Sequence, residues 1–368
     1  MQFVDQIAGS LLGTAVGDAV GLPLENLSRR RLDAWLGNKP LRHRFLLGYA
    51  MVSDDTEHTC LVAQSLIRSG NDAENFGSDL ARRLKWWLAG LPAGTGRATA
   101  RACIRLWMGI DWRRSGVWSA GNGPAMRAAI IGVAMTDTQQ AIKFTRASSQ
   151  ITHSDPKATY GALAIASLAN HFAHRARDTT VFDGLESMFA RWINANDDDA
   201  AELMQLINAA IASARQGEST QEFAQQAGWE RGVTGYTYQT VPVAVHACLR
   251  HPENFRAAID GLVRCGGDVD STAAIAGGIL GAKLGEDGIP DDWLNPLIEW
   301  PRSKAWMRQL ARVLADTRST STDPADSLQS VSSNSEMPTI NPLAQLVRNL
   351  FFLAVVLVHG LRRLLPPY

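Results

Sequence analysis

Apolar residues recur at helical spacing along most of the chain, starting close to its N-terminus. Ile7, Leu11, Leu12, Ala15 and Ala19 fall on one face of a first helix. A stripe of small residues at four-residue spacing follows the same helix and consists of Gly9, Gly13 and Gly17. Such a stripe lets another backbone come close, although glycine lowers helix propensity. We therefore expect a close packing partner for this helix.

Helical periodicity continues through the middle of the chain. We expect further helices over Thr59–Arg68, Asn75–Leu88, Thr99–Met108, Pro124–Val133, Ala158–His171, Asp199–Gln216, Val241–Arg250, Asn254–Val263 and Ser271–Leu284. No run of alternating apolar and polar residues with hairpin turns competes with them. The pattern predicts one compact all-α domain that spans residues 1–315.

The composition changes after residue 315. Residues 316–341 are rich in Ser, Thr, Asp, Asn and Pro and contain few large apolar residues. Such a composition cannot support a hydrophobic core, so we expect residues 316–341 to form a disordered linker. A chain that ends near Asp316 is then expected to fold without the segments that follow.

Residues 342–368 are predicted to form a hydrophobic tail helix. Its apolar run, Leu350–Val358, is shorter than the about 20 residues that cross a membrane. Arg348 precedes the run, and Arg362 and Arg363 follow it, where long side chains can reach a membrane surface. We favour a tail helix that associates with a membrane, peripherally or as a tail anchor. The alternative is a helix that docks on the main domain or on a second subunit.

Composition narrows the classes of function. The 368 residues are 46% hydrophobic and 20% charged, which is ample for a large core. The formal net charge is zero, whereas a nucleic-acid-binding protein usually carries a basic bias. The four cysteines show no CxxC spacing, and no signal peptide is evident at the N-terminus. We therefore expect a cytoplasmic protein that does not bind nucleic acid.

Two acidic stretches carry most of the candidate chemistry. Ser53-Asp54-Asp55-Thr56-Glu57 and Gly266-Gly267-Asp268-Val269-Asp270-Ser271-Thr272 each place two carboxylates beside a hydroxyl, ahead of an apolar helical segment. Each stretch alone is explained by helix N-capping, because helix N-termini favour negative charge. If both stretches meet in the fold, burying their carboxylates together is costly unless a cation neutralises them. Oxygen ligands without histidine or cysteine suit Mg²⁺ or Mn²⁺.

A third acidic residue follows the first helix. Pro23 ends that helix, so Glu25 falls on a loop from which it can reach into a site. A solvated loop residue is the ordinary alternative for Glu25.

Other segments suggest ligand binding. Gly121-Asn122-Gly123 precedes Pro124 at a helix start, where backbone N–H groups can hold a phosphate; the alternative is an ordinary tight turn. His153 is a candidate hydrogen-bonding partner for phosphate or ribose, although a lone histidine is more often structural. Tyr236 is a candidate to stack on an adenine ring, or else a buried core tyrosine.

These motifs, in this order, resemble the ADP-ribosylglycohydrolase family. The resemblance rests on Gly17–Glu25, Ser53–Thr56, Gly121–Arg127, Thr152–Pro156 and Gly266–Ser271 and spans residues 7–285. One segment departs from the pattern. Some family members carry an acidic residue where this chain reads Pro92-Ala93-Gly94-Thr95-Gly96.

The resemblance implies an all-α fold with two divalent cations, Mg²⁺ or Mn²⁺, in a cleft. It implies the metal ligands Ser53, Asp54, Asp55, Asp268, Asp270 and Ser271. It also implies that Glu25 sits on a mobile loop over the site, where it gates the site or contacts substrate and water.

The function expected from this resemblance is hydrolysis of the bond between ADP-ribose and a protein side chain, arginine above all. Asp55 or Asp270 would act as base toward water with help from Glu25, and the diphosphate would lie on Gly121–Gly123, with the adenine toward Tyr236. A protein that binds ADP-ribose without turnover, such as a reader or a toxin-immunity module, is one alternative. A hydrolase of a small derivative such as O-acetyl-ADP-ribose is another.

Overall fold

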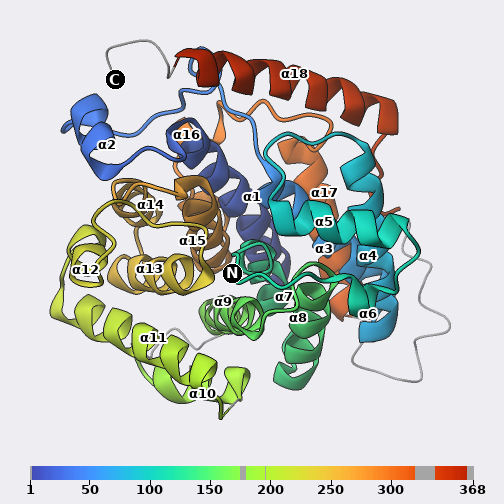
Figure 1. Cartoon of the computed structure of the whole chain (residues 1–368), viewed down its shortest axis with the longest axis horizontal. Helices are drawn as coiled ribbons and strands as arrows, with labels where there is room; N and C mark the ends of the chain where they lie inside the picture. Colours follow the sequence, from blue (N-terminus) through green and yellow to red (C-terminus); the bar gives the residue numbers. More distant parts are fainter. Residues whose placement is uncertain (1, 175–179, 195, 320–335, 363–368) are drawn as a thin grey trace.

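The computed structural model describes residues 2–174, 180–194, 196–319 and 336–362. Within these ranges the regular structure is helical, with isolated β-bridges between loops and no strand (Figure 1). This confirms the predicted all-α class.

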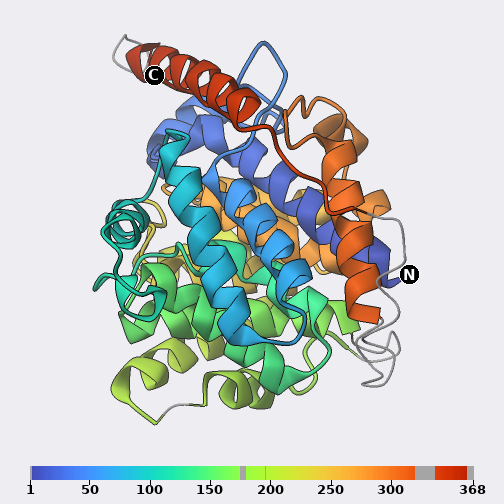
Figure 2. The same ribbon diagram turned by 90° about the vertical axis from the view of Figure 1, so that its right-hand side faces the viewer.

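The elements follow one another in chain order, with α1 and α15 at the centre of the molecule and other helices around them (Figures 1 and 2). The α-helices are α1 Phe3–Gly21, α2 Arg29–Leu36, α3 Asp54–Ser69, α4 Ala73–Ala89, α5 Arg97–Trp107, α6 Trp112–Ser115, α7 Ala129–Ala134, α8 Thr138–Thr152, α9 Pro156–His174, α10 Leu185–Ile193, α11 Asp198–Gln216, α12 Thr220–Gln226, α13 Thr237–Arg250, α14 Phe255–Val263, α15 Val269–Leu284, α16 Asp291–Leu294, α17 Lys304–Ser319 and α18 Pro342–Arg362. Short 3₁₀ turns are η1 Leu22–Leu24, η2 Ala125–Arg127 and η3 Glu286–Gly288.

Helices α1 and α15 run antiparallel in close backbone contact. A Cβ atom added to Gly13 would lie 2.2 Å from the Gly277 carbonyl oxygen, and one added to Gly277 would lie 2.1 Å from that of Gly13. At one end of the pair, Gly21 meets the backbone of Asp270 in the same way. The close approach predicted from the glycine stripe is confirmed. It brings the C-terminal end of α1 beside the N-terminal end of α15.

Several helices were not predicted from the pattern, including α2, α8, α10, α12 and α17. Helix α8 shows why. Thr145, Ser148, Ser149 and Thr152 are buried on its inner face beside apolar residues, so half of the buried positions are polar in sequence. Hydrophobic periodicity misses such a helix, because small hydroxyl residues fill positions that apolar residues usually occupy.

The structure differs from the predicted linker at both of its ends. Helix α17 continues past residue 315 to Ser319. Residues 336–341 pack on the domain, where the Pro338 carbonyl accepts a hydrogen bond from Gln64 and the Thr339 carbonyl accepts one from Trp306. Residues 320–335, the middle of the predicted linker, lie outside the described residues.

The predicted tail helix is present as α18, and it docks on the domain through buried polar residues. Arg348 is 2% exposed and donates to both carboxylate oxygens of Glu299 at 2.8 Å and to the Val52 carbonyl at 2.5 Å. Asn349, fully buried, donates to the Gly90 carbonyl at 2.7 Å. The arginine that was expected to reach a membrane surface therefore anchors the helix to the domain. Residues 363–368 lie outside the described residues.

Two described helices are long and apolar enough to cross a membrane. In the first, Phe3–Leu24, which is α1 with η1, 94% of the residues in the most apolar 18-residue window are buried. In the second, Pro342–Arg362, which is α18, that window has a mean hydropathy of 1.7 and only 17% of its residues are buried. Whether a membrane covers the rest of α18 stays a prediction.

The contact between α1 and α15 gives a first testable prediction. Gly277→Ala should lower the free energy of unfolding by about 3 kcal/mol, because the added methyl group meets a backbone carbonyl that cannot move aside. Gly360→Ala on α18 is the matched control, since its Cβ meets nothing within 4 Å and alanine favours a helix. Urea unfolding measures both, and equal stability of the two variants would contradict the interlocked pair.

The anchor of α18 gives a second prediction. Arg348→Ala should cost about 3–5 kcal/mol in thermal or urea unfolding, because it leaves the buried carboxylate of Glu299 without its cationic partner. Arg312→Ala, at an exposed position of α17, should change stability by less than about 0.5 kcal/mol. If the two arginine variants unfold alike, α18 does not contribute to the folded domain.

Candidate metal centre and cleft

The first acidic stretch begins helix α3. Ser53 is the N-cap residue, and its hydroxyl accepts from the Asp55 backbone N–H. Asp54 and Asp55 fill the first turn, where the helix dipole favours negative charge. Glu57, in the same stretch, is bound elsewhere: it pairs with Arg302 at 2.8 Å and accepts from the Trp87 indole at 2.6 Å.

Asp18 on α1 fixes the start of α3. Its carboxylate is fully buried and accepts from the backbone N–H groups of Ser53 and Thr56 and from the Thr56 hydroxyl at 2.5 Å. Asp18 lies in the motif Gly17–Glu25, but no role was predicted for it from the sequence. The available signal was its position, because residue 18 continues the apolar face of residues 7, 11 and 15, where a charge has to find partners.

The second acidic stretch begins helix α15 after two glycines. Gly267 has φ of +88°, and a Cβ atom there would lie 2.0 Å from the Val233 carbonyl oxygen, so only glycine fits. Asp268 follows as the N-cap residue and accepts from the Asn122 side-chain amide at 2.6 Å. Gly266 also has a positive φ, of +76°, so the backbone turns sharply before Asp268.

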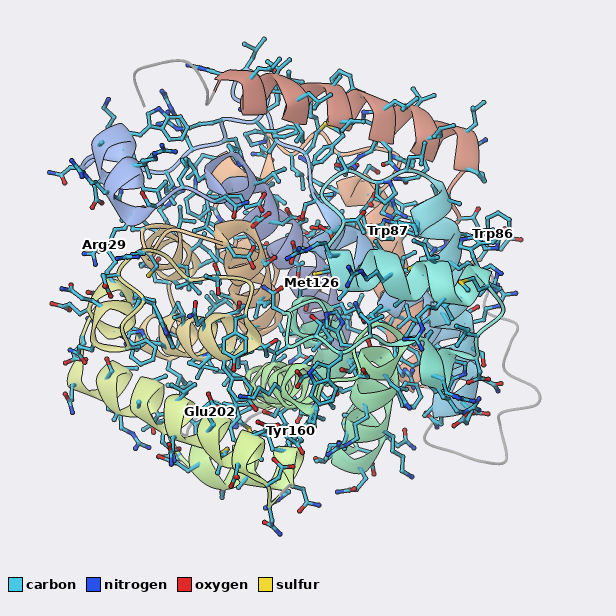
Figure 3. The ribbon with its side chains drawn as sticks, in the orientation of Figure 1. Arg29, Trp86, Trp87, Met126, Tyr160 and Glu202 are labelled. Carbon is cyan, nitrogen blue, oxygen red and sulfur yellow. The ribbon has the colours of Figure 1, made fainter. Side chains whose placement is uncertain are left out.

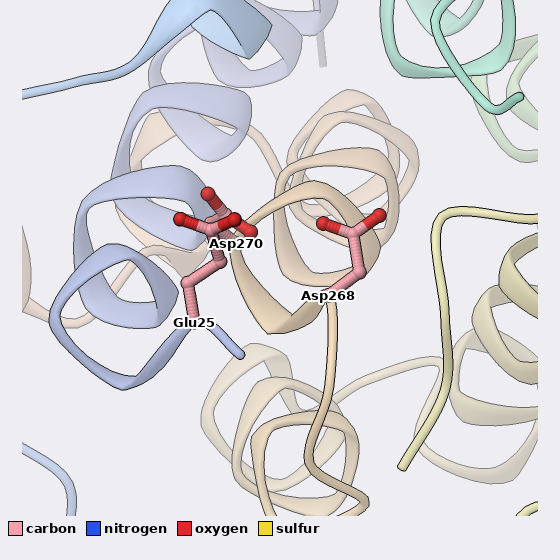
Figure 4. A group of neighbouring side chains, drawn as sticks. All are labelled: Glu25, Asp268 and Asp270. Carbon is pink, nitrogen blue, oxygen red and sulfur yellow. The ribbon is translucent and has the colours of Figure 1, made fainter. Parts of the chain in front are cut away.

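Glu25 follows η1 at the end of α1. Its carboxylate, with those of Asp268 and Asp270, forms a group whose ligand oxygens lie within 4.8 Å of one another (Figure 4). The loop that carries Glu25 is tied to the second stretch, since Asn26 N–H donates to the Gly267 carbonyl and Gly267 N–H donates to the Leu27 carbonyl. The mobility that was expected of this loop stays a prediction.

The two acidic stretches meet. Asp55 is 1% exposed, and one of its oxygens accepts from the hydroxyls of Ser53 and Ser271 at 3.1 and 3.2 Å. Its other oxygen, Oδ1, is buried without a hydrogen-bond partner among the described residues, and so is Oδ1 of Asp270. Buried oxygens without a donor are costly, so the site calls for a group that binds them.

Burial and mutual repulsion act on the carboxylates together. Burial, followed by the charges of Asp18 and Asp54, raises the pKa of Asp55 well above its ordinary value. Burial, followed by the charges of Glu25 and Asp268, does the same for Asp270. A cation reverses this cost, because it neutralises the charges and binds the unpaired oxygens. The donor set is entirely oxygen and fits a hard divalent metal.

A cleft of about 890 Å³ opens at these residues. Met126, labelled near the centre of Figure 3, lines it. Most of the other lining comes from segments 25–28, 53–55, 93–99, 121–123 and 231–235, from Gly267, Asp268, Asp270 and Ser271, and from His153. Segment 93–99 supplies no carboxylate to this wall, which agrees with the departure noted in the sequence.

The glycine loop 121–123 lines the cleft and contacts the second acidic stretch directly. Asn122 donates from its amide to Asp268 and to the Thr240 hydroxyl, so it holds a candidate metal ligand in place. A Cβ on Gly123 would lie 2.9 Å from the His153 ring, so this glycine lets the loop pass over the histidine. Binding of a phosphate by the loop stays a prediction.

His153 and Tyr236 differ in their placement. His153 is 3% exposed and lines the cleft, and burial together with the charge of Arg127 lowers its pKa to about 3. It is therefore a neutral hydrogen-bonding group at pH 7. Tyr236 is not among the residues that line the cleft, and its hydroxyl accepts from Lys157 at 3.1 Å. Its stacking on adenine stays a prediction.

Helix α18 forms part of the cleft, which the sequence did not indicate. Phe352 and Val356 line it on the side of Leu22 and Ala93. The anchor Arg348 bonds the carbonyl of Val52, the residue before Ser53. Helix α18 therefore lines the cleft and also binds the segment that leads into the first acidic stretch.

Comparison with known proteins identifies the family. A family model described as ADP-ribosylglycohydrolase matches residues 1–324. The chain belongs to the ADP-ribosylglycohydrolase family. A solved structure described as an ADP-ribosylglycohydrolase-related protein complex has a TM-score of 0.63 and 25% identity, covering 86% of this chain and 99% of that one. The resemblance drawn from the motifs, and the fold that it implied, are confirmed.

Curated relatives of this ADP-ribosylglycohydrolase family member come from bacteria and animals. ADP-ribosyl-[dinitrogen reductase] glycohydrolase of Rhodospirillum rubrum is 25% identical over 80% of this chain and 90% of its own length. ADP-ribosylarginine hydrolase Tri1 of Serratia proteamaculans is 29% identical over 83% of this chain and 79% of its own. ADP-ribosylhydrolase ARH3 of Gallus gallus is 27% identical over 77% of this chain and 87% of its own length. The family therefore acts on ADP-ribosylated substrates.

The repulsion among the buried carboxylates predicts that removing one of them stabilises the metal-free protein but weakens its stabilisation by metal. Asp270→Asn should raise the free energy of unfolding of the metal-free chain by about 1 kcal/mol, because one buried charge is removed. The same variant should lose most of the stabilisation by Mn²⁺, which for the wild type is about 2.7 kcal/mol at a hundredfold excess over Kd.

Thermal unfolding with chelator and with Mn²⁺ measures both effects. Asp287→Asn, an exposed carboxylate in η3, is the control and should behave as the wild type. If the unfolding temperature of the wild type is the same with Mn²⁺, with Mg²⁺ and with chelator, the candidate metal centre is contradicted.

Proposed function

We propose that this protein is a metal-dependent hydrolase that releases ADP-ribose from modified protein side chains, arginine above all, by cleaving the ribosyl glycosidic bond. The observation that carries the proposal is the meeting of Asp55 and Asp270, each with a buried oxygen that has no donor among the described residues. This feature lies in a cleft of a size typical for small-molecule sites. Family membership supplies the substrate class.

The residues that would hold two cations, Mg²⁺ or Mn²⁺, are Ser53, Asp54, Asp55, Asp268, Asp270 and Ser271. When bound, such ions supply charge that orients ribose hydroxyls and makes a water more acidic. The chain itself keeps these ligands in place. Asp18 fixes the backbone of Ser53, and the Asn122 amide fixes Asp268.

The carboxylates divide the remaining work in this proposal. Asp55 or Asp270 accepts the proton of the attacking water, and Glu25, whose oxygens lie within reach of Asp268 and Asp270, assists. The bond to ribose breaks through a transition state with positive charge on the sugar. An acidic cleft suits such a transition state, because negative charge stabilises it.

The walls of the cleft would hold the rest of ADP-ribose. The loop Gly121–Gly123 lines the cleft beside Asp268 and would take the diphosphate. His153, uncharged at pH 7, would contribute a hydrogen bond rather than a positive charge. The arginine linkage is favoured because one relative is named an ADP-ribosylarginine hydrolase at 29% identity.

The test uses the full-length chain, because α18 is part of the cleft. The chain is incubated with protein ADP-ribosylated on arginine, with protein ADP-ribosylated on serine, and with O-acetyl-ADP-ribose, each with Mg²⁺, Mn²⁺ or chelator. Release of ADP-ribose is followed by chromatography. We expect metal-dependent release from the arginine-linked substrate, reduced at least about a hundredfold in Asp55→Asn.

Each other outcome is informative. Preferential release from another substrate would retain the hydrolase and replace the linkage. Binding of free ADP-ribose without any release would point to a reader or an immunity module instead. Full turnover in chelator would refute a metal-dependent mechanism. Asp287→Asn serves as the control, since this exposed carboxylate lies outside the cleft.

A further inference from the structure

The face of α18 that turns away from the domain is apolar. Leu343, Leu357, Val358 and Leu361 are 57–68% exposed, whereas Phe352 on the inner face is 2% exposed. The helix contains no acidic residue. Exposed apolar residues in a contiguous row mark a surface that binds something, because scattered single residues are the ordinary case. In Figure 2 the helix lies along one side of the molecule, where it is open to the outside.

A turn beside α18 extends this apolar face. Phe45 stacks on Phe352 at 5.0 Å, and its carbonyl bonds His359 at 2.6 Å, so the turn that follows is held against the helix. Leu47 in that turn is 96% exposed and has φ of +49°. A leucine in the left-handed region is strained and, at this exposure, gains nothing from the domain. A partner outside the domain that binds Leu47 would account for an exposed leucine at this position.

Arginines border the apolar face at the C-terminal end of α18. A cavity of about 440 Å³ is lined by Arg42, Arg44, His359 and Arg362, next to Leu47. None of these arginines takes part in an ion pair among the described residues, and Nε of Arg44 is buried without a hydrogen-bond partner there. Like charges gathered around a cavity favour an anion with oxygen acceptors, such as a phosphate group.

We propose that this surface binds the face of an anionic phospholipid bilayer. Helix α18 lies in the plane of the interface with its outer residues among the acyl chains, and the arginine cavity takes a headgroup phosphate. The pairing of an apolar row with basic residues is the composition that such interfacial helices have. A spanning arrangement is disfavoured, because Arg348 and Asn349 hold α18 on the domain through buried bonds.

The test is sedimentation of the full-length chain with phosphatidylcholine vesicles, with and without phosphatidylserine. We expect binding that requires phosphatidylserine and weakens as salt rises. Leu47→Asp should weaken binding at least about tenfold, because it puts a carboxylate where an apolar side chain enters the lipid. Arg42→Gln should weaken vesicle binding about fivefold, because one basic residue near an anionic surface contributes about that factor to the affinity.

The variants are chosen so that the fold is not at risk. Leu47 lies off the helix, and aspartate tolerates the left-handed conformation better than leucine does, so thermal stability should be unchanged. Met108→Asp is the matched control, at a residue 72% exposed after α5, and should bind as the wild type. Equal loss of binding in Met108→Asp would overturn the proposed surface.

Other results would also overturn the proposal. No sedimentation with anionic vesicles would exclude the bilayer as the partner. Equal binding to neutral vesicles would remove the role of the arginine cavity. A dimer in analytical ultracentrifugation that Leu47→Asp abolishes, without vesicle binding, would assign the face to a second copy of the chain. Hydrolase activity is not used as a readout, so failure here leaves the proposed function untouched.

Discussion

Carboxylates that are buried together repel one another, and the helices of this protein are arranged to hold them in place despite that repulsion. Asp55 and Asp270 come from segments far apart in sequence, yet Ser271 bonds Asp55 directly. Burial raises the pKa of both groups well above the ordinary value, so the metal-free site is under strain as a set of anions. The two helix N-termini lessen this cost, but oxygens without donors remain. An arrangement of this kind favours the binding of cations.

The remainder of the fold holds those carboxylates together. The glycine contact between α1 and α15 brings Glu25 to Asp268 and Asp270, and Asp18 ties the start of α3 to α1. On the outer side, Arg348 of α18 bonds Glu299 and the backbone before Ser53. Helix α18 thus has two roles: its inner face completes the domain and the cleft, and its outer face is left to a partner.

The sequence predicted the features that rest on local pattern or on motif. The apolar face of α1, the close packing partner of its glycine stripe and, through the family resemblance, the shared site of the two acidic stretches are of this kind. The position of Asp18 on the apolar face of α1 indicates a buried acid, but its role depends on N–H groups of Ser53 and Thr56, which periodicity does not place beside it. Nor could the sequence predict that Asn122 turns its amide to Asp268, or that Phe352 lines the cleft. These contacts join segments more than a hundred residues apart, and periodicity carries no information about such pairs.

Divalent cations are proposed to occupy the space between the two acidic stretches. Crystals of the full-length chain soaked in Mn²⁺ and measured at the manganese absorption edge would locate them, because anomalous scattering detects the metal independently of any assay. We expect anomalous peaks within about 2.2 Å of Oδ1 of Asp55 and of Oδ1 of Asp270. An ordered cleft without any peak beside these oxygens, at a Mn²⁺ concentration that stabilises related metal sites, would contradict the proposal.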